Sequence, residues 1–232
     1  MPSLLVTSQS NYKILKKMGE IKYYSKIYIV KNTLSKKMKR FKGKVTGIGG
    51  GSVIDTAKLL ALPNPCHAIP TTASGAAVTS HAVIWGKNKI DVKTPIPILS
   101  HAYLYYPIKL NSKTLKRTIA DCFCHIIESK NSKKSNQESI FYCGLAERYF
   151  MMYLISGNIY HLINAGNYAG KAIEITGTNF IHAISYVLTI DYGFCHGDAL
   201  IQALNIHQRK DSKEIIHKAM KLYPKFYESS CL

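Results

Sequence analysis

Residues 44–62 read KVTGIGGGSVIDTAKLLAL and give the clearest indication of the fold class. It begins with Lys44–Ile48, a β-branched run that is typical of a buried strand. Glycines follow directly, and Ser52–Leu62 then shows the apolar spacing of a helix that stops before Pro63. Because glycines allow close backbone approach and a helix N-terminus attracts anions, a strand, a glycine turn and a helix in this order can seat a pyrophosphate.

The residues around this stretch predict further strands and then a change to helices. Before Pro107 the pattern indicates short strands and one basic helix, and after it the spacing is helical. The N-terminal elements are strands at Lys26–Val30, His67–Ile69, Val83–Trp85, Ile90–Val92 and Ala102–Tyr106, and a helix at Leu34–Arg40. The C-terminal helices are Ser112–Lys130, Gln137–Ile155, Ile159–Ile175, Asn179–Ile190 and Asp198–Ile206. The predicted fold class is α/β followed by α, with an α/β nucleotide-binding domain over residues 1–108 and an all-helical domain over residues 109–232.

Composition indicates an ordinary globular protein. Apolar residues make up 47% of the 232, and no run reaches the roughly 18–20 apolar residues that a membrane span needs. The first ten residues lack the features of a secretory signal, so we expect a cytoplasmic protein without a membrane partner. The six cysteines form no C-x-x-C pair, which favours free thiols over disulfides or a zinc ribbon.

The charge is strongly positive, with 31 Lys and Arg against 13 Asp and Glu. It is densest between Lys13 and Lys44, where Glu20 is the only acid. Such a block could neutralise the phosphates of a nucleic acid. It carries no nucleic-acid-binding module, so a solvated surface is the favoured interpretation, and the positive field would also attract anionic cofactors and substrates.

Two motifs resemble signatures of the iron-dependent (group III) alcohol dehydrogenase family. Gly49–Lys58, GGGSVIDTAK, is similar residue for residue to the family's GGGSxxDxAK, and Ile69–Thr79 resembles its PTTAGTGSEVT loop. In the second motif Ala77 stands where the family usually has Glu. The resemblance implies that residues of both motifs bind NAD or NADP, mainly at its pyrophosphate. These residues are Gly49, Gly50, Gly51, Ser52, Asp55, Thr71 and Thr72.

A third set of residues has metal-ligand chemistry. Asp121 and His125 are four apart on a predicted helix and project from one face, although a buried acid–histidine pair would look the same. His182 and His196 lie in later apolar segments, where single histidines are usually core residues. The family holds its metal with an Asp and a His four apart, then a His in an HAxxH-like segment, then a His in PHG. By that resemblance Asp121, His125, His182 and His196 are the ligands of one Fe²⁺ or Zn²⁺, and the donor set suits borderline divalent ions.

The resemblance also implies where cofactor choice is made. Family members that prefer NAD often carry an acid after the first strand, where it accepts hydrogen bonds from the ribose hydroxyls. With Lys26–Val30 as that strand, the corresponding residues are Lys31 and Asn32, so Asn32 is a predicted cofactor contact. A lysine in place of a carboxylate removes the repulsion of a 2′-phosphate, so NADP use is expected alongside NAD.

The implied function is a metal-dependent oxidoreductase that transfers a hydride between NAD(P) and a small alcohol or aldehyde, working as a homo-oligomer such as a dimer. The chain resembles a shortened member, because only Asn32–Thr46 separates the predicted first strand from the glycine turn and the chain ends soon after His196. Tyr186 and Cys195 also replace a His and a Pro that many relatives have. An alternative is a non-catalytic remnant that binds metal or nucleotide and acts as an interaction partner.

Overall fold

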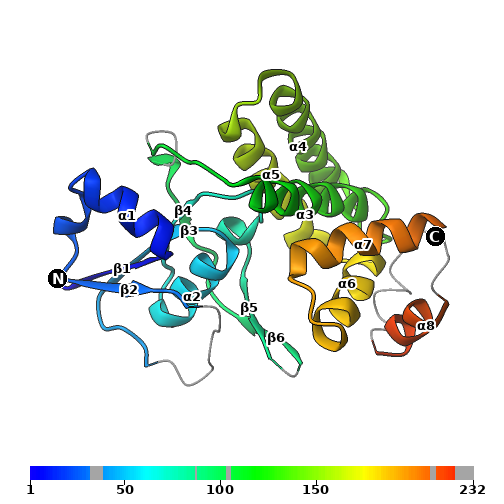
Figure 1. Cartoon of the computed structure of the whole chain (residues 1–232), viewed down its shortest axis with the longest axis horizontal. Coiled ribbons are helices and arrows are strands. Elements are labelled where there is room, and N and C mark those ends of the chain that lie inside the picture. The colour runs from blue at the N-terminus through cyan, green and yellow to red at the C-terminus, as the bar shows by residue number, and fades with distance from the viewer. Residues whose placement is uncertain (32–38, 87, 103–105, 210–212, 223–232) are drawn as a thin grey trace. The chain divides into compact units, whose positions relative to one another are not determined.

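The computed structural model describes residues 1–31, 39–86, 88–102, 106–209 and 213–222. The chain forms two compact units, Met1–Lys109 and Leu110–Leu232 (Figure 1). The first unit contains a parallel sheet with helices, and the second consists of helices and their connections. The predicted fold class, α/β followed by α, is therefore confirmed.

A five-stranded parallel sheet organises the first unit, with the strand order β2-β1-β3-β4-β7. The central strands are buried along nearly their whole length, as parallel strands covered on both faces are. Their side chains explain this, because Leu4, Leu5 and Val6 in β1 and Val45 and Ile48 in β3 are apolar and buried. The strands are β1 Ser3–Thr7, β2 Lys26–Ile29, β3 Lys44–Gly49, β4 His67–Pro70 and β7 Ile98–Leu99.

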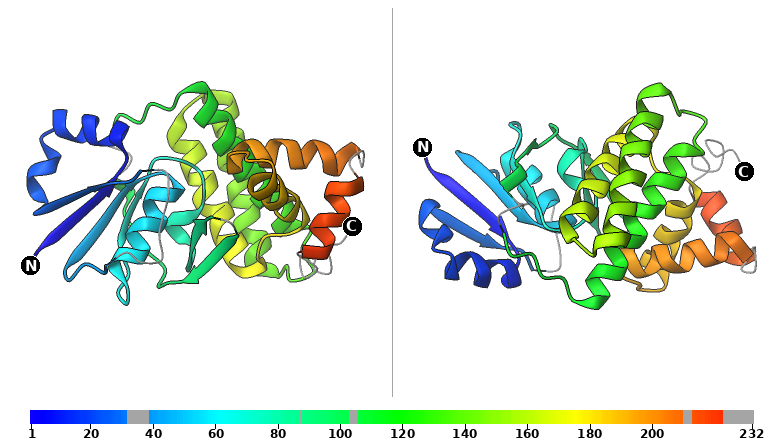
Figure 2. Two further views of the ribbon diagram at one scale, coloured as in Figure 1. Left: turned by 60° about the horizontal axis from the view of Figure 1, so that its bottom comes forward. Right: turned by 90° about the horizontal axis from the view of Figure 1, so that it is seen from above.

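Helices α1, Gln9–Lys17, and α2, Gly51–Ala61, cover opposite faces of this sheet (Figure 2). From β1 the chain passes through α1 to the edge strand β2, returns to the other side of β1 for β3, and passes through α2 to β4. Because crossovers are right-handed, steps in opposite directions place their helices on opposite faces. β1 and β3 therefore form the switch point of the sheet, where α/β proteins bind ligands at the carboxyl ends of the strands.

The first strand and the first helix are missing from the sequence prediction. It takes Lys26–Val30 as the first strand, whereas the structure places β1 and α1 before this segment and makes it the edge strand β2. β1 has only five residues and α1 buries a single side chain, Leu15, so neither gives a strong periodic signal. The helix predicted at Leu34–Arg40 lies mostly outside the described residues, as does the centre of the strand predicted at Ala102–Tyr106.

The strands predicted at Val83–Trp85 and Ile90–Val92 are confirmed, and together they form a hairpin. β5, His81–Trp85, pairs antiparallel with β6, Lys89–Lys93. Ala82 and Ile84 of β5 pack with Leu59 of α2, so the hairpin lies against the helix that follows the glycine turn.

The second unit is built from helices α3 to α8, of which the sequence predicts all but α8. The start of α3 is set by Asn111, whose side chain accepts a hydrogen bond from the N–H of Thr114. A core forms where apolar side chains at helical spacing on α7, among them Leu200 and Ala203, pack with Ile184 of α6. Among the described residues, no helix has both the length and the apolar character needed to cross a membrane. The helices are α3 Ser112–Lys130, α4 Gln137–Ser156, α5 Ile159–Thr176, α6 Phe180–Asp191, α7 His196–Arg209 and α8 Lys213–Leu222.

Candidate functional site

The glycine turn lies at the carboxyl end of β3, beside the switch point. Gly50 is the N-cap of α2 and provides no side-chain cap, which leaves the first N–H groups of the helix available to an anion. A Cβ at Gly49 would lie 2.7 Å from the Cβ of Val53, so only glycine lets the strand run this closely into the helix. Ser52 in the first turn of α2 is exposed. The turn therefore has the geometry of an anion-binding helix N-terminus.

The loop after β4 lies against this turn. The N–H of Thr71 donates to the carbonyl oxygen of Gly49 over 2.9 Å, and a Cβ at Gly50 would lie 3.2 Å from the side chain of Thr72. The structure thus brings the two sequence motifs together. Asn32, the predicted contact outside these motifs, lies beyond the described residues and follows β2 rather than the first strand.

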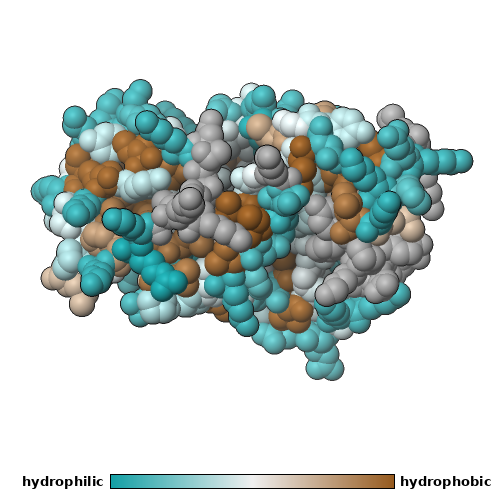
Figure 3. All heavy atoms as spheres, turned by 90° about the horizontal axis from the view of Figure 1, so that it is seen from below, coloured by the Kyte–Doolittle hydropathy of each residue, from teal (hydrophilic) through white to brown (hydrophobic). Residues whose placement is uncertain are grey.

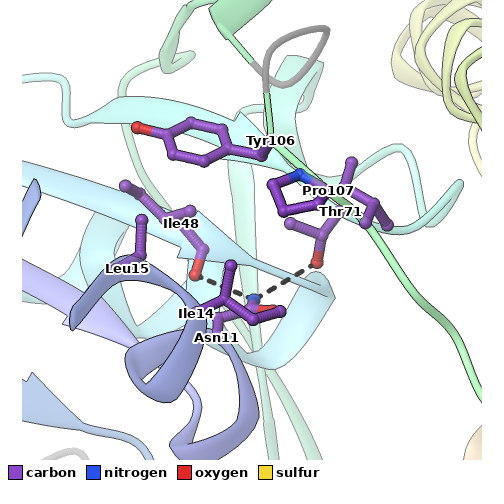
Figure 4. A pocket seen from close by; sticks show the side chains of 8 residues that line it. Asn11, Ile14, Leu15, Ile48, Thr71, Tyr106 and Pro107 are labelled. Carbon is purple, nitrogen blue, oxygen red and sulfur yellow. Dashed lines mark hydrogen bonds between the residues drawn. The ribbon is translucent and has the colours of Figure 1, made fainter. Parts of the chain in front are cut away.

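A small pocket opens beside the turn, and one amide side chain forms part of its lining (Figure 4). Asn11 of α1 donates from Nδ2 to the carbonyl oxygen of Ile48 over 3.3 Å and to Oγ1 of Thr71 over 3.4 Å. It therefore ties α1 to the ends of β3 and β4. Sequence reasoning does not find Asn11, because it misses the strand that precedes this residue. The lining residues are Asn11, Ile14, Leu15, Ile48, Thr71, Tyr106, Pro107 and Ile108.

Asp55, a predicted cofactor contact, forms a buried ion pair with Lys58 on α2. Its Oδ1 lies 3.4 Å from Nζ of Lys58, and its Oδ2 accepts a hydrogen bond of 3.2 Å from the N–H of Val83. Lys58 also donates to the carbonyl oxygen of His81 over 2.6 Å, so the pair holds β5 against α2. Burial raises the pKa of the Asp55 carboxyl to about 6, against the attraction of Lys58.

This carboxyl predicts a loss of stability as the pH rises. Its pKa moves from 3.8 to about 6 on folding, so the folded chain holds the proton more tightly than the unfolded chain. The contribution is complete below about pH 4 and is lost as the pH rises through about 6, which lowers the free energy of unfolding on the order of 3 kcal/mol. Urea denaturation across this range should show the fall in the wild type and in Glu147→Gln, whose carboxylate on α4 is exposed, but not in Asp55→Asn. A constant difference between the wild type and Asp55→Asn would contradict this expectation.

Three of the four predicted metal ligands come together in the second unit. Asp121 and His125 are one turn apart on α3, and Nε2 of His125 lies 3.4 Å from Oδ1 of Asp121. His182 stacks its ring on that of His125, with centroids 4.9 Å apart, and its Nε2 lies 3.7 Å from the same Oδ1. One ligand atom from each of the three residues lies within 4.8 Å of the others. This spacing fits a single ion.

Burial supports a cation between these atoms. Asp121 Oδ1 and His182 Nε2 are buried and have no hydrogen-bond partner among the described residues. An unpaired buried polar atom costs about 1–3 kcal/mol, and a divalent ion would satisfy both atoms at once. Burial favours the neutral carboxyl of Asp121, but the histidines around it hold its pKa below the ordinary value. A carboxylate with imidazoles is the donor set of a borderline ion such as Fe²⁺ or Zn²⁺, so the residues present fit the group.

His196, the fourth predicted ligand, lies next to this set at the N-terminus of α7. Its ring centroid is 5.6 Å from that of His182 and 6.1 Å from that of Tyr186. Tyr186 is buried, and its hydroxyl is 3.1 Å from Oγ1 of Thr178. His196 is therefore within reach of the cluster, and its role as a ligand stays a prediction.

Two features hold the N-terminus of α7 against α3. A Cβ at Gly197 would lie 2.5 Å from the Cβ of Arg117 and 3.0 Å from its Cα, so a glycine is needed for this approach. Arg117 also donates two hydrogen bonds to the carboxylate of Asp198, over 2.8 Å and 2.5 Å. A forked pair of this kind fixes geometry as well as energy. The approach of the two helices sets the position of His196.

Glu128 belongs to the cluster and is absent from the predicted site residues. Its carboxylate is 3% exposed and accepts hydrogen bonds from the backbone N–H of His182 over 2.9 Å and from Nδ1 of His182 over 2.5 Å. Burial opposes charge on both groups, but their attraction holds the pKa of Glu128 below its ordinary value and that of His182 well above. The sequence contains a signal for this residue, because Glu128 comes seven residues after Asp121 and so lies on the same face of α3.

No protein-family model matches the sequence, but individual proteins are similar to it. The chain is 28% identical over 193 residues to phosphonoacetaldehyde reductase of Streptomyces viridochromogenes, with 66% of this chain and 49% of that protein covered. It therefore spans about half the length of this curated relative.

The fold is that of solved alcohol dehydrogenase structures. An iron-containing alcohol dehydrogenase from Thermotoga maritima gives a TM-score of 0.72 at 24% identity, covering 96% of this chain and 76% of that one. Sulfoacetaldehyde reductase from Bifidobacterium kashiwanohense, solved in complex with NAD⁺, gives a TM-score of 0.69 at 18% identity, covering 94% of this chain and 77% of that one. The two glycine- and threonine-rich motifs also lie in contact, and the ligand-type residues are assembled. The chain therefore has the fold of the iron-containing alcohol dehydrogenases and is similar in sequence to a phosphonoacetaldehyde reductase.

Proposed function

We propose that this chain is a metal-dependent oxidoreductase that transfers a hydride between NAD or NADP and a small alcohol or aldehyde. The proposal is carried by the buried, unpartnered ligand atoms of Asp121 and His182 beside the ring of His125. Buried polar atoms almost always have a hydrogen-bond partner, so the lack of one at these two atoms favours a cation bound between them. Besides a metal site, such an enzyme needs a site for the cofactor phosphates. The glycine turn at the switch point of the sheet supplies it, as a helix N-terminus that can hold a phosphate.

Each unit contributes one part of this chemistry. In the first unit, the N–H groups at the start of α2 and the Thr71–Thr72 loop hold the pyrophosphate. When bound in the second unit, Fe²⁺ or Zn²⁺ supplies Lewis-acid polarisation of the substrate oxygen. A nicotinamide cofactor held in the first unit would supply the hydride that reduces the carbonyl carbon, with the alcohol proton coming from water. The proposed ion ligands are Asp121, His125, His182 and His196.

The substrate class we propose is a small aldehyde that carries an anionic group. Two similar proteins are reductases of phosphonoacetaldehyde and sulfoacetaldehyde, both of which are aldehydes of this kind. The chain has a net charge of +18, and hydrophilic side chains cover much of the face in Figure 3. A positive field raises the local concentration of anions, which favours such substrates over uncharged ones.

Self-association forms part of the same proposal. α4 exposes large apolar side chains, with Phe141 61%, Leu154 58% and Ile155 83% exposed. Exposed apolar side chains gathered on one helix often mark an interaction surface, so we propose that a second copy of the chain covers them. Sedimentation velocity of the purified protein tests this point.

The deciding experiment measures NADH and NADPH oxidation with phosphonoacetaldehyde, sulfoacetaldehyde and propanal on protein purified without oxygen. We expect turnover that is lost after chelation and restored by Fe²⁺ or Zn²⁺, with the anionic aldehydes preferred. Metal content is measured on the same sample. Metal bound without turnover on any aldehyde would favour the non-catalytic alternative, and a folded protein that binds no metal would refute the proposed centre.

A further inference from the structure

Glu128 connects α3 to the first turn of α6 and uses both of its carboxylate oxygens to do so. Oε1 accepts from the backbone N–H of His182, and Oε2 accepts from Nδ1 of the same residue. The N-cap of α6, Asn179, makes no side-chain cap hydrogen bond, so the carboxylate takes over this task from another helix. An anion is favoured at this end of a helix, where the macrodipole is positive.

We propose that Glu128 is the positioning residue of His182: it holds the proton on Nδ1, so that Nε2 is the nitrogen that faces Asp121 and His125 and can bind an ion there. This inference rests on the proposed metal centre. An ionised carboxylate can only accept hydrogen bonds, so the contact requires a proton on Nδ1. Ligating histidines commonly give their other N–H to a carboxylate, and such partners tune the metal affinity.

The ring of His182 has no freedom to reverse this arrangement. It is 2% exposed and lies flat on the ring of His125, with 4° between the planes. Turning the ring over would separate Nδ1 from Glu128 and remove Nε2 from the neighbourhood of Asp121 Oδ1, 3.7 Å away. One carboxylate therefore sets both the position of α6 and which ring nitrogen of His182 is available to an ion.

The variant Glu128→Gln tests this role with almost no change of shape. The amide has a single oxygen, whereas the structure presents two donors, the backbone N–H and the Nδ1–H of His182. If the oxygen keeps the backbone N–H, the amide nitrogen faces Nδ1 and drives the proton to Nε2. We expect Zn²⁺ affinity, measured by chelator competition, to fall about 10- to 100-fold. The control Glu147→Gln, which removes an exposed carboxylate paired with Lys130, should leave the affinity unchanged.

A second measurement needs neither metal nor turnover. Long-range ¹H–¹⁵N NMR of the metal-free protein should find Nδ1 of His182 protonated in the wild type and not in Glu128→Gln. If the amide variant does not fold, Glu128→Asp serves in its place, because it keeps two acceptor oxygens; Nδ1 should then stay protonated and the affinity should fall less than in the amide variant. An unprotonated Nδ1 in the wild type, or full Zn²⁺ affinity in Glu128→Gln, would overturn this inference and leave the proposed function intact. Absence of metal binding by the wild type would instead refute the proposed function.

Discussion

Replacing His125 by Ala should lower the affinity of the protein for Zn²⁺ or Co²⁺ by about 100-fold. Structural zinc sites with four ligands are worth roughly 10–16 kcal/mol, so one ligand contributes about 3 kcal/mol, which corresponds to a factor of about 100. His125 Nε2 is 3.4 Å from Oδ1 of Asp121, and its ring supports the ring of His182. The substitution therefore removes one ligand and loosens a second one.

The measurement is a competition titration with a chromogenic chelator, with circular dichroism to confirm that each variant is folded. His161→Ala is the matched control, because this histidine lies on α5 of the same unit and packs on Tyr149, with ring centroids 6.2 Å apart. It should bind metal like the wild type. Equal affinities of His125→Ala and the wild type would show that the cluster is an ordinary set of core histidines.

The parts of the fold that the sequence predicts are those with a long or clear period. α3 is predicted with its bounds as observed, because its apolar side chains repeat over 19 residues and Asn111 caps it. The hairpin follows from two short runs around a turn. β1 is missed because five residues give almost no period, and its place depends on pairing with β2 and β3 and on packing against α2. Strand order depends on such contacts and cannot be predicted from local spacing.

The residues of the candidate site also fall into two groups, those that local spacing predicts and those that only tertiary contacts reveal. Spacing on one helix places Asp121 and His125 on the same face, and the family resemblance nominates them as ligands. The place of His182 beside them depends on how α6 packs. Glu128 looks like a solvated acid near the end of a helix, and only its contacts with His182 show that it is buried and paired. Asn11 is hidden for another reason, because its use depends on β1 being recognised as a strand.

The same logic predicts a large effect at Gly197, a position whose importance comes from a close approach and not from chemistry. In Gly197→Ala the new Cβ would lie 2.5 Å from the Cβ of Arg117 and 3.0 Å from its Cα. Main-chain atoms cannot move aside cheaply, so α7 must shift away from α3. We expect the free energy of unfolding to fall by about 3 kcal/mol, the upper part of the range for overpacking. The shift also strains the Arg117–Asp198 hydrogen bonds and moves His196, so Zn²⁺ affinity should fall as well.

The matched substitution is Gly144→Ala on α4, where an added Cβ would meet nothing within 4 Å. Helix propensity favours alanine over glycine by about 1 kcal/mol, so this variant should be more stable than the wild type and bind Zn²⁺ equally well. Urea denaturation and the chelator titration are performed on both variants. Gly197→Ala should lower both the free energy of unfolding and the Zn²⁺ affinity, whereas Gly144→Ala should raise the first and leave the second unchanged. If Gly197→Ala resembled Gly144→Ala in both measurements, α7 would not be held against α3 by close packing at this residue. The position of His196 beside His182 would then need another cause.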